Sequence, residues 1–90
     1  PILVVVFNNG RWNSVGAAVG ELAPDGWAVS NNDYVLVDLK PAPNYERISE
    51  DCGGYGERVE DPSELPAAIQ RALHEVRVNG RQALLNVICA

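Results

Sequence analysis

A chain of 90 residues, 47% hydrophobic and 21% charged, has room for one small domain, and no repeat or low-complexity tract divides it. The net charge of −5, with Lys40 as the single lysine and six arginines that do not cluster, excludes a protein that binds nucleic-acid backbones. No apolar run approaches the roughly 18–20 residues of a membrane span, and the first residues do not have the pattern of a signal peptide.

The first residues predict a strand that ends at a binding site. Residues 2–7 are apolar without alternation and are mostly β-branched or aromatic. This pattern is typical of a strand buried on both faces in the middle of a parallel sheet. Asn8 and Asn9 follow directly. Because ligands of such sheets bind beyond the carboxyl ends of the strands, we expect both asparagines to lie at a ligand site.

The next segment predicts a weak helix and then a loop. Asn13 or Ser14 can cap a helix that ends before the turn signal of residues 23–26, and each of its two internal glycines costs about 1 kcal/mol. Its apolar side is formed by Val15, Ala18, Val19 and Leu22. Residues 27–43 mix apolar and turn-forming stretches. We expect a loop-rich excursion there with one short extended segment, of the kind that forms lids or binding loops.

Beyond this loop, the apolar spacing predicts a helix followed by a strand. Tyr45, Ile48 and Cys52 share one helical face, and a glycine pair at 53–54 ends the helix. Residues 55–59 then form a short strand.

A capped helix and a final strand complete the pattern. The run Asp61-Pro62-Ser63-Glu64 provides an N-cap Asp, a Pro at the first helical position and a Glu placed for a capping box. Apolar residues recur with helical spacing from Leu65 to Val76, Asn79-Gly80 ends the helix, and residues 82–89 form the closing strand. This alternation predicts an α/β domain with a parallel sheet and helices on both faces.

The two cysteines, Cys52 and Cys89, have a spacing that suits neither a metal knuckle nor a redox pair. We expect reduced thiols that act as small apolar fillers in a cytoplasmic protein. A disulfide between them is the alternative that the sequence leaves open. Because a strand buried on both faces needs neighbours at both edges, we also expect residues 1–90 to be the C-terminal portion of a larger chain.

Taken together, these segments resemble the end of a thiamine-diphosphate-dependent enzyme. The residues that carry the likeness are the apolar strand ending in Asn8-Asn9, the run GGYGERVEDPSELPAA at 53–68, and the closing strand. The likeness is nearest to the acetolactate synthase-like group and covers nearly the whole chain. It implies that residues 1–90 are the C-terminal half of a thiamine-diphosphate-binding domain.

The resemblance implies half of a site for thiamine diphosphate and Mg²⁺. In this family the motif begins with Gly-Asp-Gly and ends about 25–30 residues later in the asparagine pair, so only its second half is present. By resemblance, Asn9 supplies a side-chain oxygen to Mg²⁺, Arg11 supplies its backbone carbonyl, and Asn8 supports the turn. Gly10 and Trp12 complete the cofactor-binding segment. Such neutral oxygens suit Mg²⁺, which binds few protein groups together with phosphates of its ligand.

The resemblance also implies what other segments must supply. The Asp of the missing half-motif is the charged metal ligand, and the glutamate that activates the aminopyrimidine belongs to a different domain, usually on a neighbouring subunit. Residues 1–90 therefore contribute no catalytic residue and are expected to be inactive alone. The implied partners are the rest of the parent chain, a second subunit of a homo-oligomer and a 2-oxo acid. Val15 and Ala18 replace the Glu and the Trp of two groups of relatives, so no named reaction transfers.

Some of these residues also have a structural interpretation. The Asn-Gly dipeptide is a common turn, which can itself aim the amide at a metal. Arg11 and Trp12 either line an active-site entrance, with Arg11 facing an acidic substrate, or are a solvated Arg and a packing Trp. His74 lies near the C-terminal end of the last helix, where a partly charged imidazole interacts favourably with the helix dipole.

Two functional hypotheses follow. The first is the C-terminal fragment of a thiamine-diphosphate- and Mg²⁺-dependent lyase or transferase that acts on 2-oxo acids by decarboxylation or carboligation. The alternative is a stand-alone α/β binding or self-association module without catalysis, which pairs through an exposed sheet edge.

Overall fold

A computed structural model describes residues 1–89. The chain forms two compact units: unit 1 contains residues 1–8 and the residues from Asn44 onward, and unit 2 contains residues 9–43. Within the described residues, no helix combines the length and the apolar character that crossing a membrane requires.

Unit 1 is built on a three-stranded parallel sheet with the strand order β1-β3-β2. The strands are β1 (Leu3–Asn8), β2 (Tyr55–Val59) and β3 (Ala83–Ile88). Ala83, the first residue of β3, is paired with Leu3 on one side and with Tyr55 on the other. The three strands therefore begin at the same level of the sheet. The predicted parallel α/β sheet is confirmed.

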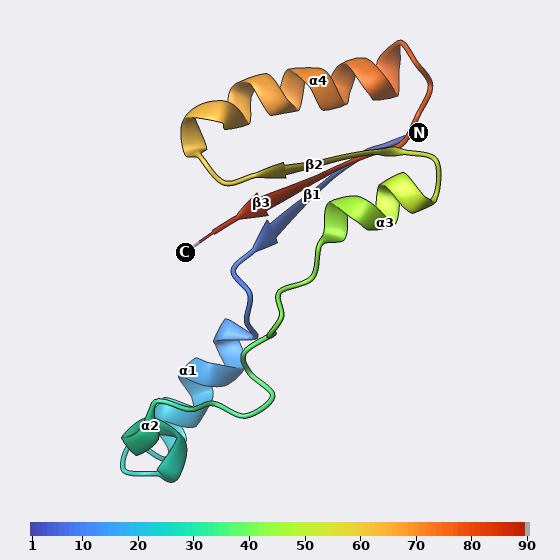
Figure 1. Cartoon of the computed structure of the whole chain (residues 1–90). Coiled ribbons are helices and arrows are strands. Elements are labelled where there is room, and N and C mark those ends of the chain that lie inside the picture. Colours follow the sequence, from blue (N-terminus) through green and yellow to red (C-terminus); the bar gives the residue numbers. More distant parts are fainter. Residues whose placement is uncertain (90) are drawn as a thin grey trace. The chain divides into compact units, whose positions relative to one another are not determined.

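Two helices cover the two faces of this sheet (Figure 1). α3 (Tyr45–Asp51) packs on β2 and β3 from one side, and α4 (Leu65–Arg77) packs on the same strands from the other. The core lies between α4 and the sheet. Its buried members are Val59, Ala68, Ala72, Ala83, Leu85 and Val87. Helices on both faces were expected, and α3 and α4 confirm that expectation.

The start of α4 follows its sequence signal. The Asp61 carboxylate accepts a hydrogen bond of 2.8 Å from the backbone N–H of Ser63, and Pro62 occupies the first helical position. The first turn is the 3₁₀ helix η1 (Pro62–Glu64), which passes into α4. The helix is followed by Gly80 at φ +64, a backbone conformation that glycine adopts without strain.

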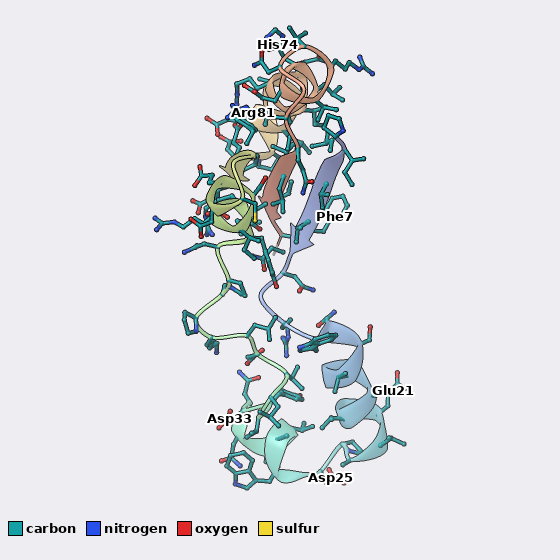
Figure 2. All side chains as sticks on the ribbon, turned by 90° about the vertical axis from the view of Figure 1, so that its right-hand side faces the viewer. Phe7, Glu21, Asp25, Asp33, His74 and Arg81 are labelled. Carbon is teal, nitrogen blue, oxygen red and sulfur yellow. The ribbon has the colours of Figure 1, made fainter. Side chains whose placement is uncertain are left out.

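The strand buried on both faces is β3 and not β1, which corrects the prediction for residues 2–7. In the described sheet β1 is an edge strand, and 73% of Phe7 and 39% of Val5 are exposed. Figure 2 shows the Phe7 side chain projecting outward from β1. α4 covers mainly β2 and β3. On this face of β1, Leu3 packs against the core, while Val5 and Phe7 remain uncovered. An apolar run indicates a strand, but it does not determine the position of that strand in the sheet.

The buried face of α3 also differs from the prediction. Ser49 is buried, whereas Ile48 is 58% exposed and Cys52 lies on the surface. The cause is the lack of a side chain at Gly56 of the neighbouring strand, where a Cβ would overlap the Glu46 backbone. Helix and strand therefore approach through small residues, and this contact selects the face.

The expectation of free thiols holds for both cysteines. Cys52 is exposed and Cys89 is half-buried, and they are not bonded to one another. Only Cys89 packs against the core, so the role of an apolar filler applies to Cys89 alone.

Unit 2 contains two helices and a returning segment. α1 (Asn13–Leu22) confirms the expected helix, while α2 (Trp27–Asn31) was not predicted. The expected caps of α1 were wrong, because its N-cap is Trp12 and no side chain caps the helix. Leu22 is 86% exposed, and within residues 9–43 only Gly16 and Val37 are buried. Unit 2 therefore has little apolar core.

Candidate functional site

The asparagine pair begins at the carboxyl end of β1. Asn8 is the last residue of the strand, and only 5% of it is exposed. Its backbone carbonyl accepts a hydrogen bond of 2.9 Å from the N–H of Cys89, which follows β3. Asn8 is thus anchored in the sheet.

Asn9 starts a turn in which its side chain accepts a hydrogen bond from the backbone. The N–H of Arg11 donates to Asn9 Oδ1 over 3.1 Å. Gly10 makes the turn possible, because its φ of +67 lies in the region that side chains disfavour. This geometry is an Asx turn, a known preference of asparagine. It holds the amide oxygen of Asn9 in one direction and leaves that oxygen a second lone pair.

A short antiparallel bridge holds the other side of this turn. The N–H of Trp12 donates to the carbonyl of Val37 over 2.8 Å, and the N–H of Leu39 donates to the carbonyl of Gly10 over 2.8 Å. Arg11 and Asp38 face each other between these two bonds. In such a pair the N–H and C=O of each residue point away from the partner strand.

The carbonyl of Arg11 therefore faces the same side as its N–H. Since that N–H is bonded to Asn9 Oδ1, this amide oxygen lies on the side of the bridge that the Arg11 carbonyl faces, so one short turn places two neutral oxygens on the same side. Amide and carbonyl oxygens are hard donors of the kind that Mg²⁺ and Ca²⁺ prefer.

The Arg11 side chain is held within unit 2. Its Nε lies 3.3 Å from Asp38 Oδ1, an ion pair whose alignment is too poor for a hydrogen bond. The guanidinium also lies 5.7 Å from the centre of the Tyr34 ring, within the range of a cation–π contact. Lys40 Nζ lies 3.5 Å from the other oxygen of Asp38. Arg11 is therefore not fully solvated, and Asp38 is its carboxylate partner.

Trp12 joins the turn to α1. Its backbone N–H is bonded to Val37, its carbonyl accepts from the N–H groups of Val15 and Gly16, and 61% of the residue is exposed. The indole is not a packing residue of unit 2, and it presents an apolar surface next to the turn.

Within residues 1–89, no group of three His, Cys, Asp or Glu side chains is arranged to hold a metal ion. The acidic residues near the end of β2 have other partners. Asp61 caps the following helix, and Glu60 pairs with Arg58 at 2.6 Å. The oxygens of the Asn9 turn are thus neutral donors without a carboxylate cluster in the described part of the chain.

Two hollows lie elsewhere in unit 1. One, of about 260 Å³, lies at the carboxyl ends of β2 and β3 and is mainly apolar. It is lined by Val59, Glu60, Asp61, Pro62, Leu65, Val87, Ile88 and Cys89. The other, of about 240 Å³, is an open depression on α4 that includes His74 (labelled in Figure 2).

Three residues that contact the turn were not identified from the sequence as part of a site. Tyr34, Val37 and Asp38 all belong to the stretch that was expected to be loop-rich. The short extended segment expected within residues 27–43 is not present as a strand: residues 35–37 form a turn, and residue 38 alone forms a bridge with residue 11. The signal was the apolar run of residues 34–37, but nothing in that run indicates which segment it contacts.

The chain matches one protein-family model. The model is described as "Thiamine pyrophosphate enzyme, C-terminal TPP binding domain", and the match extends over residues 1–87. Comparison with curated proteins and with solved structures gave no significant match.

Proposed function

The chain belongs to the family of C-terminal, cofactor-binding domains of thiamine pyrophosphate enzymes, and on that basis we propose that it serves a thiamine-diphosphate- and Mg²⁺-dependent enzyme of the acetolactate synthase-like group. The enzyme acts on 2-oxo acids by decarboxylation or carboligation, as a lyase or transferase. The cofactor, when bound, supplies the stabilised carbanion of this chemistry. The protein residues bind and orient the cofactor.

In this proposal the turn after β1 would hold the Mg²⁺ ion that thiamine diphosphate binding requires. Asn9 provides its side-chain oxygen and Arg11 provides its backbone carbonyl. The observation that carries the assignment is the Asx turn, because the 3.1 Å bond from the Arg11 N–H fixes the Asn9 amide and directs both oxygens to one side. Asn8 anchors the turn to the sheet, and Gly10 permits its shape. Trp12 offers an apolar surface to the cofactor or to a neighbouring segment.

Neutral oxygens alone bind Mg²⁺ weakly, so the proposal requires a carboxylate from another segment. The sequence has no Gly-Asp-Gly, and the described residues hold no carboxylate cluster. We assign that ligand to the part of the parent chain that forms the first half of the motif. The activating glutamate then belongs to a second subunit of a homo-oligomer. The two free thiols, Cys52 and Cys89, fit a cytoplasmic enzyme.

The test removes the Asn9 amide from the complete enzyme. We expect Asn9→Ala to raise the Mg²⁺ concentration for half-maximal thiamine diphosphate binding by at least about tenfold, because a metal ligand is lost. Binding is measured by isothermal titration calorimetry at a series of Mg²⁺ concentrations. Asn13→Ala is the matched control, since Asn13 is an exposed asparagine at the start of α1. An unchanged Mg²⁺ dependence in Asn9→Ala would overturn the proposal.

The second candidate is a self-association module without catalysis. The observation that favours it is the uncovered edge strand β1, with Phe7 73% exposed, because such an edge pairs readily with another strand. Analytical ultracentrifugation of the natural protein, together with the titration above, distinguishes the two candidates. A natural protein of about the size of this chain that self-associates and binds neither Mg²⁺ nor thiamine diphosphate would support the self-association module.

A further inference from the structure

Asp38 lies opposite Arg11 in the bridge through which Val37 and Leu39 bind the candidate metal-binding turn. We propose that Asp38 is a positioning residue for this site: it neutralises the Arg11 guanidinium and keeps the turn in the conformation that presents its two oxygens. The inference rests on the proposed function, because it concerns the same Mg²⁺ site. Asp38 does not contact the metal in this proposal, and it acts through Arg11.

The backbone geometry gives the first part of the argument. Asp38 lies opposite Arg11, and the flanking residues exchange two hydrogen bonds of 2.8 Å. Partners in such a pair have closely spaced side chains, which accounts for the ion pair between Arg11 Nε and Asp38 Oδ1 at 3.3 Å. Displacement of the 37–39 segment would therefore also displace Gly10 and Trp12, on either side of the Arg11 carbonyl.

The second part of the argument concerns charge. The carbonyl assigned to Mg²⁺ and the guanidinium belong to one residue, so their separation is shorter than the Debye length of about 10 Å at 0.1 M salt. An uncompensated guanidinium would repel a divalent cation at that range. Asp38 supplies the compensating charge, and only 27% of its side chain is exposed. Lys40 adds a second cation beside the same carboxylate, at 3.5 Å.

Two neighbours flank the guanidinium. Tyr34 lies on one side of it, with the ring centre 5.7 Å from Arg11 Cζ. Gly16 of α1 lies on another: a Cβ there would come within 3.3 Å of Arg11 Nη2 and 3.2 Å of Val37 Cγ1. These neighbours keep the guanidinium beside Asp38, which supplies the charge that compensates it.

The experiment compares three variants of the complete enzyme: Asp38→Asn, Arg11→Gln, and the two combined. Asp38→Asn keeps the shape of the side chain and removes its charge, while Arg11→Gln keeps the backbone carbonyl and removes the cation. The readouts are the Mg²⁺ concentration for half-maximal binding of thiamine diphosphate, measured by calorimetry, and kcat at saturating Mg²⁺.

We expect Asp38→Asn to raise the Mg²⁺ requirement about tenfold, with kcat at saturating Mg²⁺ within about twofold of the wild type. Arg11→Gln should lower the Mg²⁺ requirement, because it removes a cation next to the site and leaves the Asp38 carboxylate in place. The double variant should return the requirement to within about threefold of the wild type. This rescue distinguishes charge compensation from a purely structural role, because a structural role would make the double variant at least as defective as Asp38→Asn.

Two results would overturn the inference. One is an unchanged Mg²⁺ requirement in Asp38→Asn, and the other is a double variant no better than Asp38→Asn. The Asn9→Ala variant separates this failure from failure of the proposed function. If Asn9→Ala weakens Mg²⁺-dependent binding and Asp38→Asn does not, only the role of Asp38 is wrong. If neither substitution changes that binding, the Mg²⁺ site itself is misassigned.

Discussion

Replacing Gly56 with alanine tests the contact that determines how α3 packs on the sheet. A Cβ at this position would overlap the carbonyl group of Glu46 and would come within 3.0 Å of Glu50 Cγ. Overpacking of this kind costs about 1–3 kcal/mol, and the upper end applies because the obstacle is helix backbone and not a flexible side chain. Alanine recovers about 0.5–1 kcal/mol as the better residue within a strand. The net loss is about 2 kcal/mol.

Thermal unfolding followed by circular dichroism measures this loss. For a domain of this size, about 2 kcal/mol corresponds to a fall in Tm of about 8–16 °C. Gly20→Ala is the control, since a Cβ there meets no atom within 4 Å and alanine is about 1 kcal/mol better in a helix. A Gly56→Ala variant as stable as the wild type would refute the close approach of α3 and β2.

Three further substitutions test the polar contacts of unit 1. Glu57 accepts hydrogen bonds from Arg71, which are the main cause of a pKa below its ordinary value. The stability that this depressed pKa provides is present above the unfolded-state pKa of about 4.5 and is lost as the pH falls. In urea titrations, the difference in unfolding free energy between the wild type and Glu57→Gln should therefore shrink from pH 7 to pH 3. A difference independent of pH would contradict this. Asn86, which is fully buried, donates to Glu46 over 2.6 Å, and Asn86→Asp should destabilise the protein by about 3 kcal/mol or more at pH 7, because two carboxylates then meet out of water. That loss should decrease in acid, and a variant that unfolds at the wild-type urea concentration at pH 7 would argue against the contact. Asp61→Ala should lower the urea concentration at the unfolding midpoint, because the N-cap is lost, while Asp61→Asn keeps a hydrogen-bond acceptor and should not. Equal midpoints for the wild type and both variants would exclude the cap.

The sequence predicted the elements of unit 1 better than their packing. The helix start at Asp61 and the strands at 55–59 and 82–89 could be identified because capping and apolar periodicity are local properties. The buried face of α3 could not be identified from apolar spacing. That face is determined by glycines that follow the helix in the chain: Gly56 lies against Glu46 and Glu50, and Gly54 lies against Ser49, which is buried in place of Ile48.

The candidate site could also be predicted only in part from the sequence. The turn at Asn9 could be predicted, because an Asn-Gly pair after an apolar strand is a local signal. Asp38 and Tyr34 could not be assigned to it. They contact Arg11 from more than twenty residues along the chain, and no periodic pattern connects them. α2 escaped prediction because its five residues are too few for an apolar period, and it is closed by Asn32 in a left-handed conformation.

The strand order β1-β3-β2 has a consequence for how the protein folds. The two outer strands pair only with β3, and the pairing of Leu3 with Ala83 closes a loop of nearly the whole described chain. Among the described strands, β1 and β2 therefore have no partner to pair with until residues 83–88 have left the ribosome. Such non-local pairing slows folding and leaves the apolar β1 exposed in the meantime. The nascent chain is thus most vulnerable to aggregation through the same strand that leads to Asn9.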